Sequence, residues 1–101
     1  MINIGLFGKS FSGVFNNAIL KMIDRLEHHG AKIFIYDPFA PFLAKNIAFK
    51  ANGATFNEHN VEQRKLDFLI SIGGDGTLLS TIAIVKDSGI PVLGLNTGKL
   101  G

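Results

Sequence analysis

The chain of 101 residues contains no cysteine. This absence excludes a disulfide framework and a zinc site built on thiolates. It suits a reducing cytosol, and we expect a cytoplasmic protein. The opening residues MINIGLFGKSF also lack the basic start and continuous apolar stretch that are typical of a secretory signal.

Long apolar runs and a dominant charge are missing as well. No run approaches the roughly 20 apolar residues that span a bilayer, so we expect no membrane partner. The formal net charge is only +2, and the ten lysines and arginines are scattered along the chain. A basic stripe that could follow nucleic-acid phosphates is therefore absent, and we expect no nucleic-acid partner.

Apolar runs alternate with amphipathic segments along the chain. The pattern predicts strands over residues 2–8, 31–38, 66–74 and 90–96, with helices within 10–30, from 41 onward and over 76–89. Strands that alternate with helices predict an α/β fold with a parallel, Rossmann-like sheet and helices on both faces. In the third helix, the residues expected to point inward are Leu78, Leu79, Ile82, Ala83 and Val85.

Glycine-bearing loops follow three of the predicted strands: GKSFSG, GGDGT and NTGKLG. Ligands of parallel sheets bind beyond the carboxyl ends of the strands, where these loops lie. The GKS segment is not a P-loop, because Asn3 stands where the motif requires its first glycine. Lys9 is then either a solvated turn residue or a cation that faces an anion at this edge.

The segment GGDGT has two interpretations. It is not a dinucleotide fingerprint, since Leu79 occupies the position of the third glycine. In one interpretation it is a turn in which Asp75 is the N-cap of the following helix. In the other, the amides of Gly74, Gly76 and Thr77 hold a phosphate at the positive helix end. Asp75 then serves a sugar hydroxyl or a phosphate-bound magnesium ion.

GGDGT after an apolar strand, followed by a strand that ends GLNTGKLG, closely resembles the N-terminal domain of NAD kinase. GGDGT alone is similar to diacylglycerol and sphingosine kinases and, more loosely, to phosphofructokinases. The resemblance implies phosphorylation of the adenosine ribose 2′-hydroxyl of NAD, with ATP or polyphosphate as the donor. It implies no metal site on the protein, because Mg²⁺ or another divalent cation arrives with the nucleotide.

The resemblance also implies roles for individual residues. Asp75 matches the catalytic base, and Asp75 with Gly76 matches the NAD-contacting pair. Ser80 departs from the pattern, since many bacterial members have a basic residue there. The other matched positions are Gly73, Gly74 and Thr77 in the phosphate-facing loop, and Asn96 and Gly98 in the second turn, which shapes the pocket.

Under this resemblance, residues 1–101 form a truncated, nucleotide-binding N-terminal domain. The β-rich C-terminal domain of the family, with its Asn-Asp or Asn-Glu pair, is absent from the sequence. We therefore expect that the chain alone binds NAD and ATP weakly and does not turn over, and that the complete protein is a homo-oligomer. Two alternatives stay open: a lipid kinase of the diacylglycerol or sphingosine type, and a non-catalytic nucleotide-sensing domain.

Overall fold

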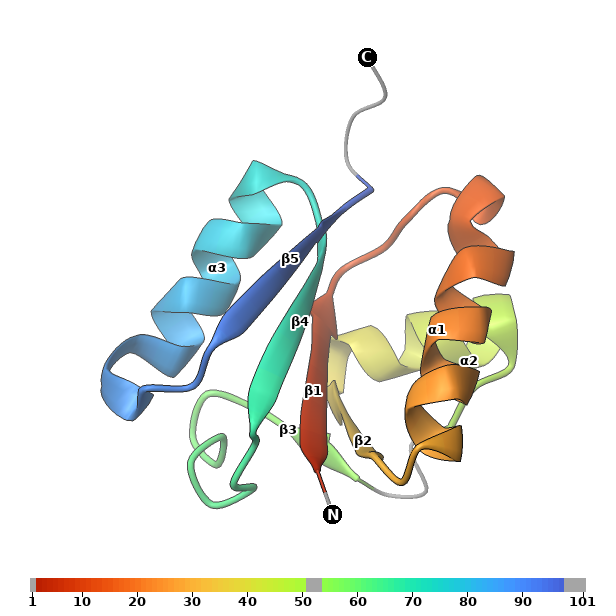
Figure 1. Ribbon diagram of the computed structural model, residues 1–101. Helices are drawn as coiled ribbons and strands as arrows, with labels where there is room; N and C mark the ends of the chain where they lie inside the picture. The colour runs from red at the N-terminus through yellow and green to blue at the C-terminus, as the bar shows by residue number, and fades with distance from the viewer. Residues whose placement is uncertain (1, 51–53, 98–101) are drawn as a thin grey trace.

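A computed structural model of the chain describes residues 2–50 and 54–97. Its centre is a five-stranded sheet with the order β3-β2-β1-β4-β5, in which every neighbouring pair is parallel (Figure 1). The predicted α/β architecture is therefore confirmed. The strands are β1 (Asn3–Gly8), β2 (Lys32–Tyr36), β3 (Thr55–Phe56), β4 (Phe68–Gly73) and β5 (Val92–Asn96).

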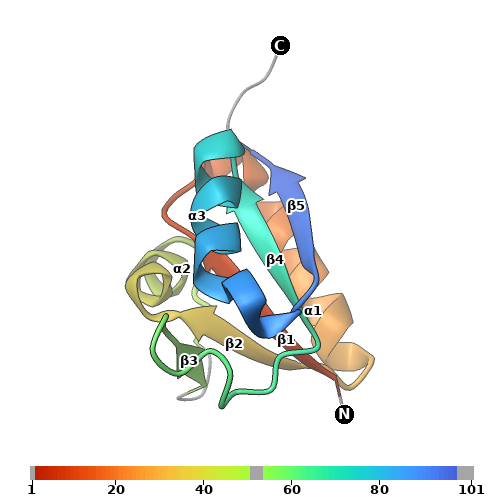
Figure 2. The ribbon, with the colours of Figure 1, turned by 90° about the vertical axis from the view of Figure 1, so that its left-hand side faces the viewer.

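Helices cover both faces of the sheet, as the alternating pattern predicts. The helices α1 (Asn16–His28) and α2 (Ala40–Ile47) lie on one face, and α3 (Asp75–Val85) lies on the other (Figures 1 and 2). Short 3₁₀ turns occupy Gly13–Phe15, Asp37–Phe39 and Lys86–Ser88. Within the described ranges, no helix has the length and apolar character that crossing a membrane requires.

Helix α1 ends in a glycine motif. Gly30 has a φ of 91°, which favours glycine because it has no Cβ. The amides of Gly30 and Ala31 donate to the carbonyls of Glu27 and Leu26, both at 3.0 Å. This pair of bonds is a Schellman motif, which satisfies carbonyls at the helix end and turns the chain toward β2.

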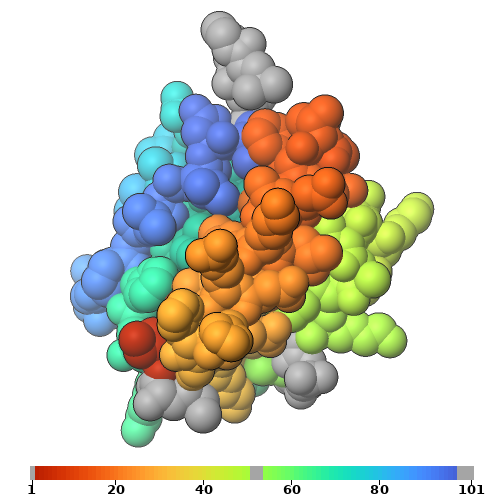
Figure 3. All heavy atoms as spheres, turned by 45° about the vertical axis from the view of Figure 1, so that its right-hand side comes forward, coloured from red at the N-terminus to blue at the C-terminus, as the bar shows by residue number. Residues whose placement is uncertain are grey.

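The hydrophobic core lies on both sides of the two central strands. Along β1, Ile4 and Leu6 pack toward α1 and α2, whereas Phe7 packs toward the α3 side with Leu69. Side chains alternate across a strand, so a strand that is apolar on both faces must be covered on both. Figure 3 shows α1 (orange) and β5 (blue) at the surface of the face that it draws, and Leu93 of β5 is exposed.

The predicted inward face of α3 is partly wrong. Leu79 and Ile82 are 68% and 48% exposed, and Ala83 is exposed too, whereas Thr81 and Val85 are buried. The helix is apolar around most of its circumference, so its periodicity does not indicate which side meets the sheet. Packing against β4 decides it, and an apolar strip stays on the outer surface.

Candidate functional site

The turn between β4 and α3 presents free backbone amides beside a carboxylate. The first intrahelical bond runs from the Leu78 amide to the Gly74 carbonyl at 3.1 Å. The amides of Asp75, Gly76 and Thr77 therefore precede the hydrogen-bond ladder and lie at the positive end of the helix dipole. Such an end favours an anion.

Asp75 is not the N-cap of this helix, and that interpretation was wrong. Gly74 occupies the N-cap position in an extended conformation, and no side chain caps α3. Asp75 is the first helical residue, and its side chain is exposed. Because the turn is made by glycine backbone alone, the carboxylate is left available for a ligand.

Glycine occupies positions 73 and 76 of this turn for different reasons. A Cβ on Gly73 would lie 2.6 Å from Oγ1 of Thr77, and its φ of 155° is rare for other residues. Gly73 is therefore required for the chain to pack against itself. An added Cβ on Gly76 would meet nothing within 4 Å. The fold does not need glycine at position 76, so close approach of a ligand is left as a reason for it.

A buried hydroxyl pair, which the sequence reasoning missed, holds the first turns of α3 on the sheet. Ser71 and Thr81 are 2% and 0% exposed, and their hydroxyl oxygens lie 2.9 Å apart in a hydrogen bond. The Thr81 hydroxyl also lies 2.8 Å from the Thr77 carbonyl, to which it donates. Two polar residues inside apolar elements were the available signal, since buried hydroxyls normally find partners.

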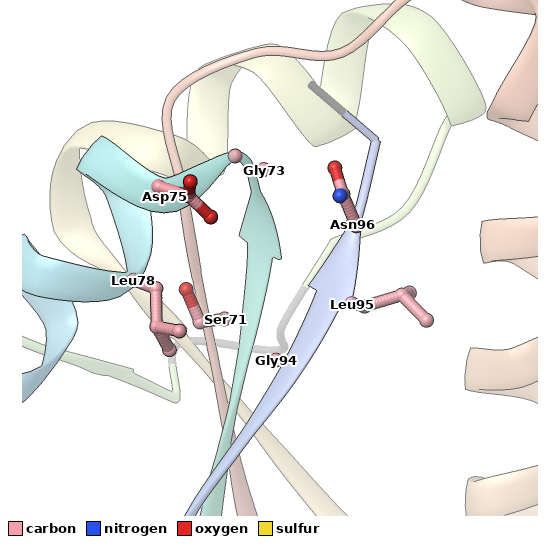
Figure 4. Close-up of a pocket in the computed structure, with 8 residues that line it drawn as sticks. Ser71, Gly73, Asp75, Leu78, Gly94, Leu95 and Asn96 are labelled. Carbon is pink, nitrogen blue, oxygen red and sulfur yellow. The ribbon is translucent and has the colours of Figure 1, made fainter. Parts of the chain in front are cut away.

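Strand β5 completes the site on its open side. Asn96 pairs in register with Gly73, and the Thr97 amide donates to the Gly73 carbonyl at 3.0 Å. Figure 4 shows Asp75 and Asn96 on either side of the end of β4. Between them lies a pocket of about 130 Å³; its lining residues are Ser71, Gly73, Gly74, Asp75, Leu78, Gly94, Leu95 and Asn96.

The structure thus brings together four predicted site residues, namely Gly73, Gly74, Asp75 and Asn96, around one pocket. Gly76 and Thr77 follow on the first turn of α3 and do not line it. Ser80, where the resemblance implies a basic residue, lies one turn further, and its hydroxyl donates to the Gly76 carbonyl at 3.1 Å. Gly98 lies outside the described residues.

The sheet topology places the turn after β4 at the edge where a parallel sheet binds ligands, and the pocket lies on the β5 side of this turn. From β1 the chain proceeds outward to β2 and β3, and then returns to add β4 and β5 on the other side of β1. The strand order therefore reverses between β1 and β4. At such a switch point the loops after the two strands diverge to opposite faces and leave a crevice at the carboxyl edge.

Unlike Asp75, Asp37, the acidic residue that follows β2, has a structural role. Hydrogen bonds from the side chains of Thr55 and Asn57 lower the pKa of Asp37, and the charge of Arg64 lowers it further. The Asn57 amide nitrogen lies 3.1 Å from the carboxylate. These bonds connect the end of β2 to the segment around β3. Nowhere in the described parts of the chain do three His, Cys, Asp or Glu side chains gather as a metal site would require.

Comparison with known proteins agrees with the motifs of this site. A family model described as ATP-NAD kinase N-terminal domain matches residues 33–101. Over nearly the whole chain, the sequence is 32% identical to a NAD kinase of Flavobacterium psychrophilum and 35% identical to one of Bacteroides fragilis. A NAD kinase of Caldicellulosiruptor saccharolyticus is 46% identical over 52 residues, which cover 52% of this chain and 20% of that protein.

The chain is shorter than these relatives. It covers 34% of the length of the Flavobacterium and Bacteroides proteins, while 99% of the chain itself is aligned with each of them. The likeness therefore extends over all the elements of the sheet, including the β4 turn and β5.

Proposed function

The chain belongs to the ATP-NAD kinase N-terminal domain family, and we propose that it forms the nucleotide-binding part of a NAD kinase. The proposed reaction transfers the terminal phosphoryl group of ATP to the 2′-hydroxyl of the adenosine ribose of NAD, which gives NADP and ADP. One observation carries the proposal: the exposed carboxylate of Asp75 stands beside the free amides at the uncapped start of α3, at the end of the strand that borders the switch point.

Asp75 acts as the general base in this proposal. The ribose oxygen forms a bond to phosphorus as the bond to the leaving ADP oxygen breaks, and the hydroxyl proton passes to the carboxylate. The transition state of phosphoryl transfer is loose, so positioning and charge neutralisation contribute more than proton removal. The amides of Asp75, Gly76 and Thr77 supply part of that neutralisation through the helix end.

The remaining predicted residues shape the nucleotide site. Gly73 and Gly74 form the turn that exposes the amides, Thr77 packs against Gly73, and Asn96 forms the wall from β5. Gly98 is assigned to the same wall by resemblance alone. We further propose that the donor is ATP or polyphosphate, that Mg²⁺ or another divalent cation arrives bound to its phosphates, and that the complete protein is a cytoplasmic homo-oligomer.

The pocket within the described residues is small for these substrates. Its volume is about 130 Å³, whereas sites for drug-sized ligands measure about 300–1,000 Å³. It has room for one phosphate-sized group, so the remainder of the nucleotide requires further walls. We propose that residues 1–101 alone bind NAD and ATP weakly and form no NADP. Robust NADP formation by the isolated chain at high concentration would disprove this.

Substitution of the base tests the proposed reaction directly. In the complete protein, we expect Asp75→Asn to lower the rate of NADP formation by about 10² to 10⁴, the usual contribution of a general base. The substitution keeps the size of an exposed side chain, so the free energy of unfolding in urea should fall by no more than about 1 kcal/mol, the interaction of the charge with the helix dipole. A loss below tenfold would remove Asp75 from this role, and phosphorylation of a dispersed lipid in place of NAD would favour the lipid-kinase alternative.

A further inference from the structure

We propose that Lys9, in the loop between β1 and α1, binds the phosphate chain of the phosphoryl donor from the opposite side of the switch point. The proposal rests on the proposed function, because it places the donor phosphates at the amide-bearing turn that begins α3. The ligand chemistry is a chain of linked phosphates, which a nucleoside triphosphate and an inorganic polyphosphate share.

The strand register places Lys9 beside the turn. Gly8, the last residue of β1, pairs with Ile72 of β4, so the next residues along the two strands are Lys9 and Gly73. Neighbouring strands lie about 4.8 Å apart where they pair, and Lys9 directly follows the last paired residue of β1. A lysine ammonium reaches roughly 6 Å from its Cα on a flexible stem. We infer that phosphates held at the Gly74–Thr77 turn, at the same edge of the sheet, come within that reach.

Packing holds the loop on both sides of Lys9. A Cβ on Gly8 would lie 2.8 Å from Cζ of Phe39 and 2.9 Å from the Ile72 carbonyl, so the backbone there sits directly against its neighbours. Three residues later, the Phe11 ring packs edge-on against Phe42 with ring centroids 4.9 Å apart. The backbone of the loop is therefore anchored, while the Lys9 side chain is exposed to solvent.

A cation at this edge would balance the repulsion between Asp75 and a bound phosphate. Asp75 lines the pocket and repels phosphate, and the helix dipole offsets only part of that repulsion. In the described segments that directly follow β1, β2, β4 and β5, which are 9–12, 37–39, 74 and 97, Lys9 is the only basic residue. Its ammonium is uncommitted, because the one ion pair found in the described ranges joins His59 and Glu58.

Tripolyphosphate is the probe, and the chain itself is the sample. We expect it to shift the amide NMR signals of Gly74–Thr77 at low ionic strength. Lys9→Gln should weaken this binding about tenfold. This is the effect of losing one charge-assisted hydrogen bond, reduced because the lysine is exposed to solvent. Lys9→Arg should stay within about threefold, since the charge is kept. Lys21→Gln on the exposed side of α1 is the matched control, and it should leave binding and the thermal midpoint unchanged.

Further titrations separate the sources of the phosphate. ATP should lose affinity in Lys9→Gln by the same factor as tripolyphosphate, and adenosine should lose none. Tighter binding of ATP than of tripolyphosphate to the wild type would indicate a nucleoside triphosphate as the preferred source, and equal or weaker binding would indicate polyphosphate.

The outcomes distinguish the two claims. If tripolyphosphate shifts the Gly74–Thr77 amides but Lys9→Gln binds as well as the wild type, the role of Lys9 is overturned and the site stands. Equal losses of affinity in Lys9→Gln and Lys21→Gln would show only a general attraction between the positive charge of the protein and the anion. That result would overturn the role of Lys9 too. If the wild-type amides do not respond, the phosphate site of the proposed function fails together with this inference.

Discussion

Replacement of Gly76 by alanine separates what the fold requires from what a ligand requires. Gly76 is the second residue of α3, is exposed, and is not among the residues with positive φ. An added Cβ would meet nothing within 4 Å. Alanine in a compatible helical position stabilises a protein by about 0.4–1 kcal/mol, because the unfolded chain loses freedom. We therefore expect the free energy of unfolding to rise by about 0.5 kcal/mol.

The same methyl group should weaken phosphate binding. Cβ atoms of a helix tilt toward its N-terminus, so the Gly76→Ala methyl group projects toward the amides that begin α3. A phosphate oxygen held by those amides at about 2.9 Å would have to withdraw or lose a bond. The loss of one hydrogen bond to a charged group, about 1.5–3 kcal/mol, corresponds to an affinity roughly 10- to 100-fold weaker.

Urea unfolding measures the first effect, and titration with tripolyphosphate measures the second. Gly13→Ala is the matched control, since a Cβ there would meet only Asn16 Nδ2 at 3.8 Å and lies in another helical turn. It should raise the free energy of unfolding by a similar amount, because the unfolded chain loses the same freedom, and leave tripolyphosphate binding unchanged. Gly73→Ala should instead destabilise the fold, because its Cβ would collide with Thr77. Binding to Gly76→Ala with wild-type affinity would refute the argument that ligand approach explains this glycine.

Three further predictions concern the scaffold. The lowered pKa of Asp37 contributes stability above about pH 4 that is lost as the pH falls; Asp37→Asn should therefore narrow the difference in urea stability between pH 7 and pH 3, and an unchanged difference would contradict this. Thr81→Val should destabilise the chain by about 1–2 kcal/mol, because it leaves the buried Ser71 hydroxyl without a partner. The double variant with Ser71→Ala should lose less than the sum of the single losses, which unfolding of all three variants would measure. Leu79→Ser should change the unfolding free energy by under about 0.5 kcal/mol, since Leu79 is 68% exposed. A large loss of stability would instead place Leu79 in the core.

Most of the predictions that the structure confirms came from local sequence patterns. The four longer strands lie where apolar runs end in glycine or in polar residues, and Gly30 ends the first helix region. The short strand β3 falls within a segment without a readable pattern, because two residues are too few for alternation to appear. The predicted inward face of α3 was wrong for a related reason. Nearly every position of the helix is apolar, so no alternation of apolar and polar residues marks the buried side.

The amino-acid sequence by itself determined that glycine backbone and one carboxylate meet at a turn after a buried strand, because backbone freedom and short-range apolar periodicity are local properties. The motif also determined the family. Only the tertiary structure decided that β4 lies beside β1, which makes the switch point beside that turn and brings Lys9 and Gly73 to the same edge of the sheet. It also decided that Thr81 rather than Leu79 faces the sheet, and that Asp37 bonds to its neighbours. These outcomes depend on pairing between segments far apart in the chain, where packing and hydrogen-bond partners decide between arrangements that local sequence leaves equivalent.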